Sequence, residues 1–269
     1  MTSMTTRVAV TRVPGGRDDD TLVVEEPLEI RLAPASDQWS EKPVSVTMRT
    51  PGDDFALAAG FLATEGILAA REEIESIRHW GSPNVVRVGV RHPIDLQRLQ
   101  RHFYSTSSCG VCGKTSIDAL RVHTTPLEDD VCADAAILAT MPDTLRARQR
   151  IFDTTGAIHG AAAFTRDGAI VRAFEDVGRH NAVDKVVGSM FLDGERADVL
   201  VVSGRASFEI VQKCVVARIP ILAAVGAPSS LAVDLAREFN LTLLGFVRQG
   251  RFNVYSSEAR VRSGTAPEG

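Results

Sequence analysis

The fold of this chain is decided by residues 199–246, whose sequence is VLVVSGRASFEIVQKCVVARIPILAAVGAPSSLAVDLAREFNLTLLGF. Three short, continuously apolar segments in this stretch alternate with two segments of helical periodicity. We expect strands at 199–202, 221–225 and 242–246 and helices at 208–217 and 230–239. Apolar strands that alternate with helices predict a mostly parallel sheet with helices on both of its faces.

The preceding residues extend this domain toward the N-terminus. We expect helices at 143–152 (opened by Pro142) and 179–191, and strands at 161–165 and 169–174 joined by a hairpin turn at 166–168. Residues 117–256 are therefore expected to form one α/β domain, and ligands of such sheets bind at the carboxyl ends of the strands.

A smaller α+β lobe is expected at residues 21–103. Alternating apolar and polar residues predict strands at 28–32, 44–48 and 85–90, and a helix at 55–65 capped by Asp53 and Asp54. Residues 1–20 are expected to be a mobile N-terminal arm, and the polar residues 257–269 a frayed C-terminal tail.

Composition excludes several classes of protein. The 269 residues include 30 Lys and Arg against 34 Asp and Glu, a net charge of -4, which argues against a nucleic-acid-binding protein. No apolar run approaches the roughly 18 residues that cross a bilayer, so no membrane association is expected. The first residues lack the apolar core of a secretory signal, and four cysteines in a chain this long do not make a disulfide scaffold. We therefore expect a cytoplasmic protein in a reducing compartment.

The segment 104–116 is predicted to be a mobile loop because Ser, Gly and Thr dominate it, and it contains the pair Cys109 and Cys112. Three interpretations compete. The pair could be half of a zinc site, although Cys132 and Cys214 are single and distant and are expected to be buried as small hydrophobic residues. It could be a thioredoxin-like dithiol, or it could be a persulfide carrier in which one cysteine accepts a sulfane sulfur and passes it on.

Two histidine-containing segments are further candidates. His159 is followed two residues later by Ala161, where the zinc nucleoside deaminases carry the Glu of their H-x-E motif, so deaminase chemistry and a catalytic metal are not expected. His159 could equally be a structural histidine that ties a turn. Residues 175–185, with the sequence EDVGRHNAVDK, are predicted to form a functional surface beside His159.

Polar residues follow three of the predicted strands, at 203–205, 226–230 and 248–251. Arg248 and Arg251 flank a glycine, and Arg205 precedes a helix whose N-terminal amides can hold an oxyanion. Two arginine clusters at one sheet edge predict a diphosphate-containing ligand such as a nucleotide. No P-loop or dinucleotide-binding glycine motif is present.

The chain resembles the formate dehydrogenase accessory sulfurtransferases of the FdhD/NarQ family. The segments that carry the resemblance are SCGVCGK at 108–114, FDTTG at 152–156 with His159, EDVGRHNAVDK at 175–185, SGRASFE at 203–209 and GFVRQGRFNVY at 245–255. They occur in order, and the resemblance covers nearly all of residues 22–256.

The resemblance implies a cytidine-deaminase-like fold, in which a mixed sheet has helices on both faces, without the zinc chemistry of the deaminases. It also implies a sulfurtransferase activity. Sulfur would pass from a cysteine desulfurase to molybdenum held by two molybdopterin guanine dinucleotides, for use by formate dehydrogenase. It also implies a homodimer, with GDP as a mimic of the cofactor. By position Cys109 would carry the persulfide and Cys112 would assist it. The cofactor-binding run would be Phe246, Val247, Arg248, Gln249, Gly250 and Arg251.

Two other functions remain open from the residues. The chain could be a non-catalytic chaperone of the molybdenum cofactor, whose cysteine pair merely shapes a loop. It could also be an interaction module stabilised by zinc.

Overall fold

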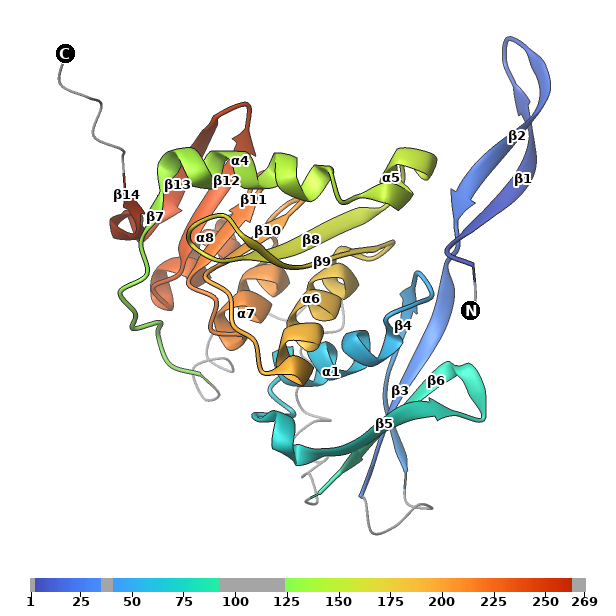
Figure 1. The fold of residues 1–269 in the computed structure, drawn as a ribbon, viewed down its shortest axis with the longest axis horizontal. Helices are drawn as coiled ribbons and strands as arrows, with labels where there is room; N and C mark the ends of the chain where they lie inside the picture. The colour runs from blue at the N-terminus through green and yellow to red at the C-terminus, as the bar shows by residue number, and fades with distance from the viewer. Residues whose placement is uncertain (1–2, 35–40, 92–123, 263–269) are drawn as a thin grey trace.

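A six-stranded mixed sheet forms the larger lobe of the computed structural model, which describes residues 3–34, 41–91 and 124–262 (Figure 1). Its order is β13-β12-β11-β10-β8-β9. The strands are β8 (His159–Phe164), β9 (Ile170–Asp176), β10 (Val199–Val202), β11 (Ile221–Ala224), β12 (Thr242–Arg248) and β13 (Arg251–Ser256).

The alternation of strands and helices predicted a mostly parallel sheet, and this prediction is wrong. Only β10–β11 and β11–β12 pair in parallel, and the other three pairings of this sheet are antiparallel. Connection length explains two of these pairings, because the short turns between β8 and β9 and between β12 and β13 leave no room for a crossover. The mixed α/β fold with a smaller N-terminal lobe is confirmed.

Helices cover both faces of this sheet. Helix α4 (Ala135–Arg146) lies on one face, and α6 (Arg179–Asp193), α7 (Phe208–Val216) and α8 (Ser230–Glu238) lie on the other (Figure 1). Side chains alternate accordingly, since Leu200 packs in the cluster of α6, α7 and α8 whereas Val201 packs in that of α4. The central strands β8, β10 and β11 are therefore buried on both faces.

The helix predicted at 143–152 is wrong in its boundaries. Helix α4 begins earlier, where the Asp134 carboxylate accepts a hydrogen bond from the Ala136 amide at 2.7 Å, and Pro142 lies inside it. Leu138, Met141 and Leu145 are buried on one side of α4, and this packing compensates for the hydrogen bond that Pro142 cannot donate. A separate short helix, α5 (Arg150–Thr155), follows.

The small lobe is a four-stranded sheet, β4-β3-β6-β5, packed against α1 (Asp54–Thr64). Its strands are β3 (Glu26–Pro34), β4 (Lys42–Arg49), β5 (Ile74–Trp80) and β6 (Ser82–Val90), with a short 3-10 helix at Arg71–Glu73 before β5. The predicted helix and three strands are confirmed, whereas β5 was not predicted. Asp53 makes no side-chain cap, and Asp54 pairs with Arg49 at 2.8 Å instead.

The terminal segments have more structure than the sequence predicts. Instead of an irregular arm, β1 (Thr5–Arg12) and β2 (Gly16–Val23) form an antiparallel hairpin that projects beside α5 (Figure 1). In the predicted tail, a 3-10 helix (Glu258–Arg260) leads to β14 (Val261–Arg262), which pairs with β7 (Ala133–Asp134). Arg260 is buried and bonds both carboxylate oxygens of Asp129 at 2.9 Å, which holds this end against the lobe.

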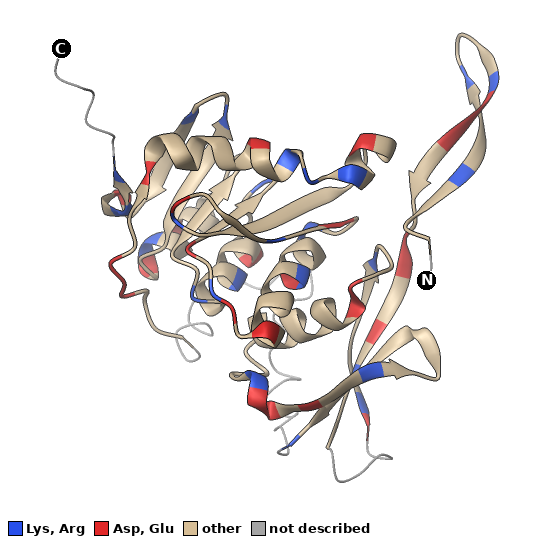
Figure 2. Cartoon of the chain, in the orientation of Figure 1, with Lys and Arg blue, Asp and Glu red and all other residues tan. Residues whose placement is uncertain are grey.

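The two lobes join where α1 crosses α6 (Figure 1). The backbones approach so closely that a Cβ at Gly60 would overlap the Asp184 carbonyl group. Figure 2 shows that acidic and basic residues are interspersed along both lobes. None of the described helices is long and apolar enough to span a membrane.

Candidate functional site

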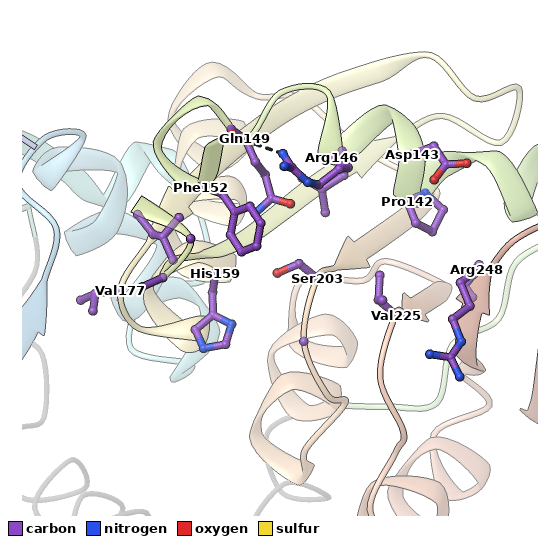
Figure 3. A pocket seen from close by; sticks show the side chains of 16 residues that line it. Pro142, Asp143, Arg146, Gln149, Phe152, His159, Val177, Ser203, Val225 and Arg248 are labelled. Atoms are coloured by element: carbon purple, nitrogen blue, oxygen red, sulfur yellow. Dashed lines mark hydrogen bonds between the residues drawn. The ribbon is translucent and has the colours of Figure 1, made fainter. Parts of the chain in front are cut away.

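A cavity of about 530 Å³ opens at the edge of the large sheet where β10, β11 and β12 end and β8 begins (Figure 3). Helices α4 and α5 form its other wall, through residues such as Pro142, Arg146 and Phe152. Its volume lies in the range of about 300–1,000 Å³ that is usual for small-molecule sites. The cavity is thus where a sheet of this kind is expected to bind a ligand.

Backbone hydrogen bonds hold the three strand-end loops side by side. The Gly226 amide donates to the Gly204 carbonyl oxygen at 2.9 Å, and the Phe246 amide donates to the Gly226 carbonyl oxygen at 3.1 Å. The three polar segments that the sequence places after β10, β11 and β12 therefore meet at one edge. Of their arginines, Arg248 lines the cavity, whereas Arg205 and Arg251 do not.

The predicted run 246–251 forms the turn from β12 to β13. Val247 is buried in the cavity wall, and Arg248 extends at its mouth (Figure 3). Arg251 lies opposite Arg248 across the turn. Phe246 (φ 55°), Gln249 (φ 53°) and Gly250 (φ 75°) all have left-handed backbone conformations, which make the turn tight. Within the described residues neither arginine forms an ion pair, so both can bind an anion.

His159 begins β8, and its side chain lines the same cavity (Figure 3). Burial lowers the pKa of His159, and the nearby positive groups of Arg179 and His180 lower it further. The imidazole is therefore neutral at pH 7 and can both donate and accept a hydrogen bond. Beside it, the Ser203 hydroxyl accepts a hydrogen bond from the Gly160 amide at 2.9 Å.

Most of the functional surface predicted at 175–185 is in fact structural. Asp176 and Lys185 form a buried ion pair at 2.8 Å, and the Lys185 ammonium donates to the Thr50 carbonyl oxygen at 2.9 Å. Asn181 donates to the Met48 carbonyl oxygen at 2.7 Å. These side chains bind the small lobe to the large one, and their burial could not be seen in the sequence.

Of the remaining members of this segment, only Val177 lines the cavity. His159 pairs with Asp176 across β8 and β9, so the expected proximity of the two segments is confirmed. Nitrogen Nε2 of His180 lies 3.8 Å from a carboxylate oxygen of Glu209, and His180 lowers the pKa of Glu209 to about 2. Arg179 Nε and Ser207 Oγ are buried without a hydrogen-bond partner among the described residues.

Glu175 supports the cavity wall from behind. Its carboxylate accepts hydrogen bonds from the Ile151 and Phe152 amides, both at 2.9 Å, and thereby caps the N-terminus of α5. Gln149, directly before α5, was missed by the sequence analysis. It lies within the helix that the sequence predicts, and no local signal distinguishes it from a solvent-facing glutamine.

Cys109 and Cys112 lie outside the described residues, so their predicted roles stay predictions. Cys214 is buried, as predicted, and burial raises the pKa of its thiol well above the usual range. Cys132 is only half-buried, which differs from the prediction. Within the described part of the chain, no group of three metal-binding side chains gathers at one place.

These features define a two-lobed α/β protein with a cavity, bordered by Arg248, at the carboxyl edge of its larger sheet. Residues 23–262 match the sequence model of the FdhD/NarQ family. The chain therefore belongs to the FdhD/NarQ family, and the resemblance inferred from its motifs is confirmed.

Known relatives cover nearly the whole chain. The sulfur carrier protein FdhD of Streptomyces avermitilis is 51% identical over 258 residues, which cover 90% of this chain and 89% of that protein. The same protein of Streptomyces coelicolor is 53% identical over 260 residues, with 90% and 89% covered. A crystal structure assigned as a formate dehydrogenase accessory protein from Desulfotalea psychrophila is 27% identical, with a TM-score of 0.74, and covers 96% of this chain and 98% of that one.

Proposed function

We propose that this chain is a sulfur carrier that serves formate dehydrogenase. It takes sulfur from a cysteine desulfurase on Cys109 and delivers it to molybdenum held by two molybdopterin guanine dinucleotides. The role of sulfur carrier is supported by relatives at 51% and 53% identity that bear this name. Delivery to a molybdenum guanine dinucleotide is supported by one observation, the cavity that Val247 and Arg248 border at the strand ends.

The residues around this cavity fit one nucleotide portion of such a molecule. Arg248 and Arg251, which lie opposite each other in the turn, match the negative charge of a diphosphate. The apolar side chains of Phe152, Ile158 and Val225 provide walls for a flat ring. GDP, which contains the same base and diphosphate, is therefore the simplest probe of the site.

Loading sulfur on Cys109 is a balanced exchange. The Cys109 thiolate attacks the terminal sulfur of the desulfurase persulfide, a new S–S bond forms on Cys109, and the desulfurase cysteine leaves as a thiolate. No net oxidation or reduction occurs. Lys114, two residues beyond the pair, adds positive charge in its neighbourhood, which favours the reactive thiolate.

Delivery to the metal needs two electrons, because sulfane sulfur is formally zero-valent and a sulfide ligand is S²⁻. Cys112 can supply them if its thiolate attacks the inner sulfur of the Cys109 persulfide. The Cys109–Cys112 disulfide then forms, and the outer sulfur leaves as sulfide toward the metal. A cellular thiol returns the disulfide to two thiols.

The test is sulfur loading with a cysteine desulfurase and ³⁵S-labelled cysteine, read by intact mass and by label. The wild type and Cys132→Ala, the matched control, should each gain one sulfur atom that dithiothreitol removes. Cys109→Ala should gain none, and normal loading of this variant would contradict the proposal. If a Cys109→Ala/Cys112→Ala double variant still supports formate dehydrogenase activity, the chain is instead a non-catalytic chaperone of the cofactor.

The proposal also covers the compartment and the oligomeric state in which the chain acts. A free cysteine pair that cycles through a persulfide requires a reducing compartment, so we place the reaction in the cytoplasm. We also propose a homodimer, which sedimentation of the purified protein can test. Zinc bound in near-stoichiometric amount to the purified protein would favour the interaction module instead.

A further inference from the structure

Gln149 presents a buried amide group to the cavity. The residue is only 3% exposed, and its side chain points between Phe152 and Ser203 (Figure 3). Gln149 occupies the N-cap position of α5 but makes no side-chain cap, since Glu175 bonds the first amides of that helix. Within the described residues its amide group has no hydrogen-bond partner. The amide atoms are not sealed from solvent, so the group faces the cavity and is free to bond a ligand or water that enters it.

The position of this amide is fixed by its surroundings. The Gln149 backbone amide donates to the Arg146 carbonyl oxygen at 3.2 Å, and its carbonyl oxygen accepts from the Asp153 amide at 3.1 Å. A Cβ at position 160 would lie 2.7 Å from Nε2 of Gln149, so Gly160 leaves the space that the amide occupies. The group is therefore held in place before any ligand enters.

A primary amide has one acceptor and one donor side by side. It forms two parallel hydrogen bonds with any ring that carries an N–H next to a carbonyl group, that is, a lactam. Guanine and pterin share such a ring, a 2-amino-oxopyrimidine. The cavity walls beside Gln149 include Phe152 and Ile158, which suit a flat ring, while Arg248 lies at the mouth where a phosphate would extend.

We propose that Gln149 recognises the lactam edge of a guanine or pterin ring bound in this cavity. Its Oε1 accepts a hydrogen bond from the ring N–H, and its Nε2 donates one to the ring carbonyl oxygen. Gln149 is then the residue that selects the base, and Arg248 binds the phosphate. This inference rests on the proposed function, because it concerns the same site and the same class of ligand.

The experiment measures binding of GDP and of free pterin by calorimetry to the wild type, to Gln149→Leu and to the matched control Gln212→Leu on α7. Loss of two hydrogen bonds, with the lactam left unpaired, should weaken binding of the recognised ring about 10-fold or more in Gln149→Leu. Gln212→Leu should bind like the wild type. Whichever ligand loses affinity identifies which of the two rings Gln149 contacts.

A second arm separates recognition from a structural effect. Methylation of the lactam nitrogen, as in 1-methyl-GDP or 3-methylpterin, removes the N–H group that would donate a hydrogen bond to Oε1 of Gln149. The methyl group should weaken binding to the wild type at least 10-fold and should have little further effect on Gln149→Leu. If Gln149→Leu does not fold, the methylated ligands still test the wild type.

The outcomes distinguish this inference from the proposed function. Unchanged binding by Gln149→Leu, or equal binding of methylated and unmethylated ligands to the wild type, would overturn the role of Gln149 alone. Failure of the wild type to bind either ring would overturn both this role and the nucleotide site. Sulfur loading of Cys109 is measured separately and depends on neither ring.

Discussion

At the scale of single residues, the cavity is lined by both neutral and charged polar side chains. Gln149 and His159 are neutral, and both lie on the wall formed by α5 and the start of β8. Arg248 is positively charged and lies at the mouth on β12. This separation matches a ligand with a neutral ring at one end and an anionic group at the other.

Arg248 supplies the first prediction. We expect Arg248→Ala to weaken GDP binding about 10- to 100-fold, because a hydrogen bond to a charged group contributes about 1.5–3 kcal/mol. The remaining affinity should depend less steeply on salt concentration. Binding is measured by calorimetry, with Arg237→Ala as the control, because Arg237 lies in the last turn of α8 and away from the cavity. Equal affinity of wild type and Arg248→Ala would contradict the phosphate role.

His159 gives a prediction about pH. Its pKa in the folded protein is below the usual value of 6.5, so the unfolded chain binds more protons than the folded one in the interval between the two pKa values. Stability should therefore decrease as the pH falls from about 6.5 to the folded-state pKa. In His159→Asn this contribution disappears.

The measurement is urea unfolding of both proteins between about pH 5 and pH 7.5, compared as a difference so that other groups cancel. The wild type should lose stability relative to His159→Asn as the solution becomes acidic. A difference that does not change with pH would mean that the pKa of His159 is not lowered.

The sequence indicated site residues where a polar side chain lies at the end of a short apolar strand. It did not indicate which polar side chains are buried. Arg248 and His159 could be chosen because Arg and His follow or precede short apolar strands. Asp176 and Lys185 were assigned to a surface because charged residues are usually exposed, whereas here they neutralise each other in the interior. Gln149 was missed because its burial depends on where α4 ends.

At the scale of elements, the crossing of α1 and α6 depends on two glycines. A Cβ at Gly188 would overlap the Ala56 carbonyl group, as one at Gly60 would overlap that of Asp184. Both contacts involve backbone atoms of the facing helix, which cannot rotate away as a side chain can. The close approach brings Thr64 within 2.8 Å of Asp184 and so completes the polar contacts between the lobes.

We predict that Gly188→Ala destabilises the protein although alanine favours helices by about 1 kcal/mol over glycine. Forcing the helices apart should outweigh that gain and lower the free energy of unfolding by about 2 kcal/mol or more. Urea unfolding measures the change, and Ser230→Ala, at the first position of α8, is the control at a helical site of another element. A variant as stable as the wild type would show that the crossing has room for a methyl group.

Elements were predictable where the local pattern agrees with the packing. The strands β10 and β11 and the helix α6 were placed correctly because their apolar periodicity is strong and their ends carry glycine or polar residues. Helix α4 was misplaced because Pro142 resembles a helix start, and only the buried side chains of the finished lobe explain how it lies inside. The direction of β13 depended on a turn whose left-handed residues, Phe246 and Gln249, gave no signal.

At the scale of the whole molecule, a buried charge cluster joins the lobes. The Lys213 ammonium on α7 donates to Asp184 on α6 at 3.0 Å and to Thr64 on α1 at 2.9 Å, and lies 3.1 Å from Glu65. Burial alone would lower the pKa of Lys213, but the carboxylates of Asp184 and Glu65 outweigh it and raise this pKa. Lys213 therefore stays charged, and the cluster is sensitive to the loss of either partner.

We predict that Lys213→Met lowers the free energy of unfolding by about 3–5 kcal/mol, because it leaves the Asp184 carboxylate buried without its cation. The double variant Lys213→Met/Asp184→Leu should be less destabilised than Lys213→Met, since no unpaired charge remains at position 184. Urea unfolding of the wild type, both single variants and the double variant gives the coupling free energy. If the two single effects simply add, the charges of Lys213 and Asp184 are not coupled, and this pair does not help to join the lobes.

The proposed relay concerns the whole molecule, because it would link a sulfur donor, the Cys109–Cys112 pair and a ligand in the cavity. If Cys112 supplies the two electrons of delivery, Cys112→Ala should accept sulfur on Cys109 as fast as the wild type but release it slowly. Added dithiothreitol should restore release, since an external thiol can attack the persulfide in place of Cys112. Wild-type protein should contain a Cys109–Cys112 disulfide after a single delivery, detectable as a loss of two mass units. Normal delivery by Cys112→Ala without added thiol would mean that the electrons come from elsewhere, and Cys112 would then act only on the reactivity of its neighbour.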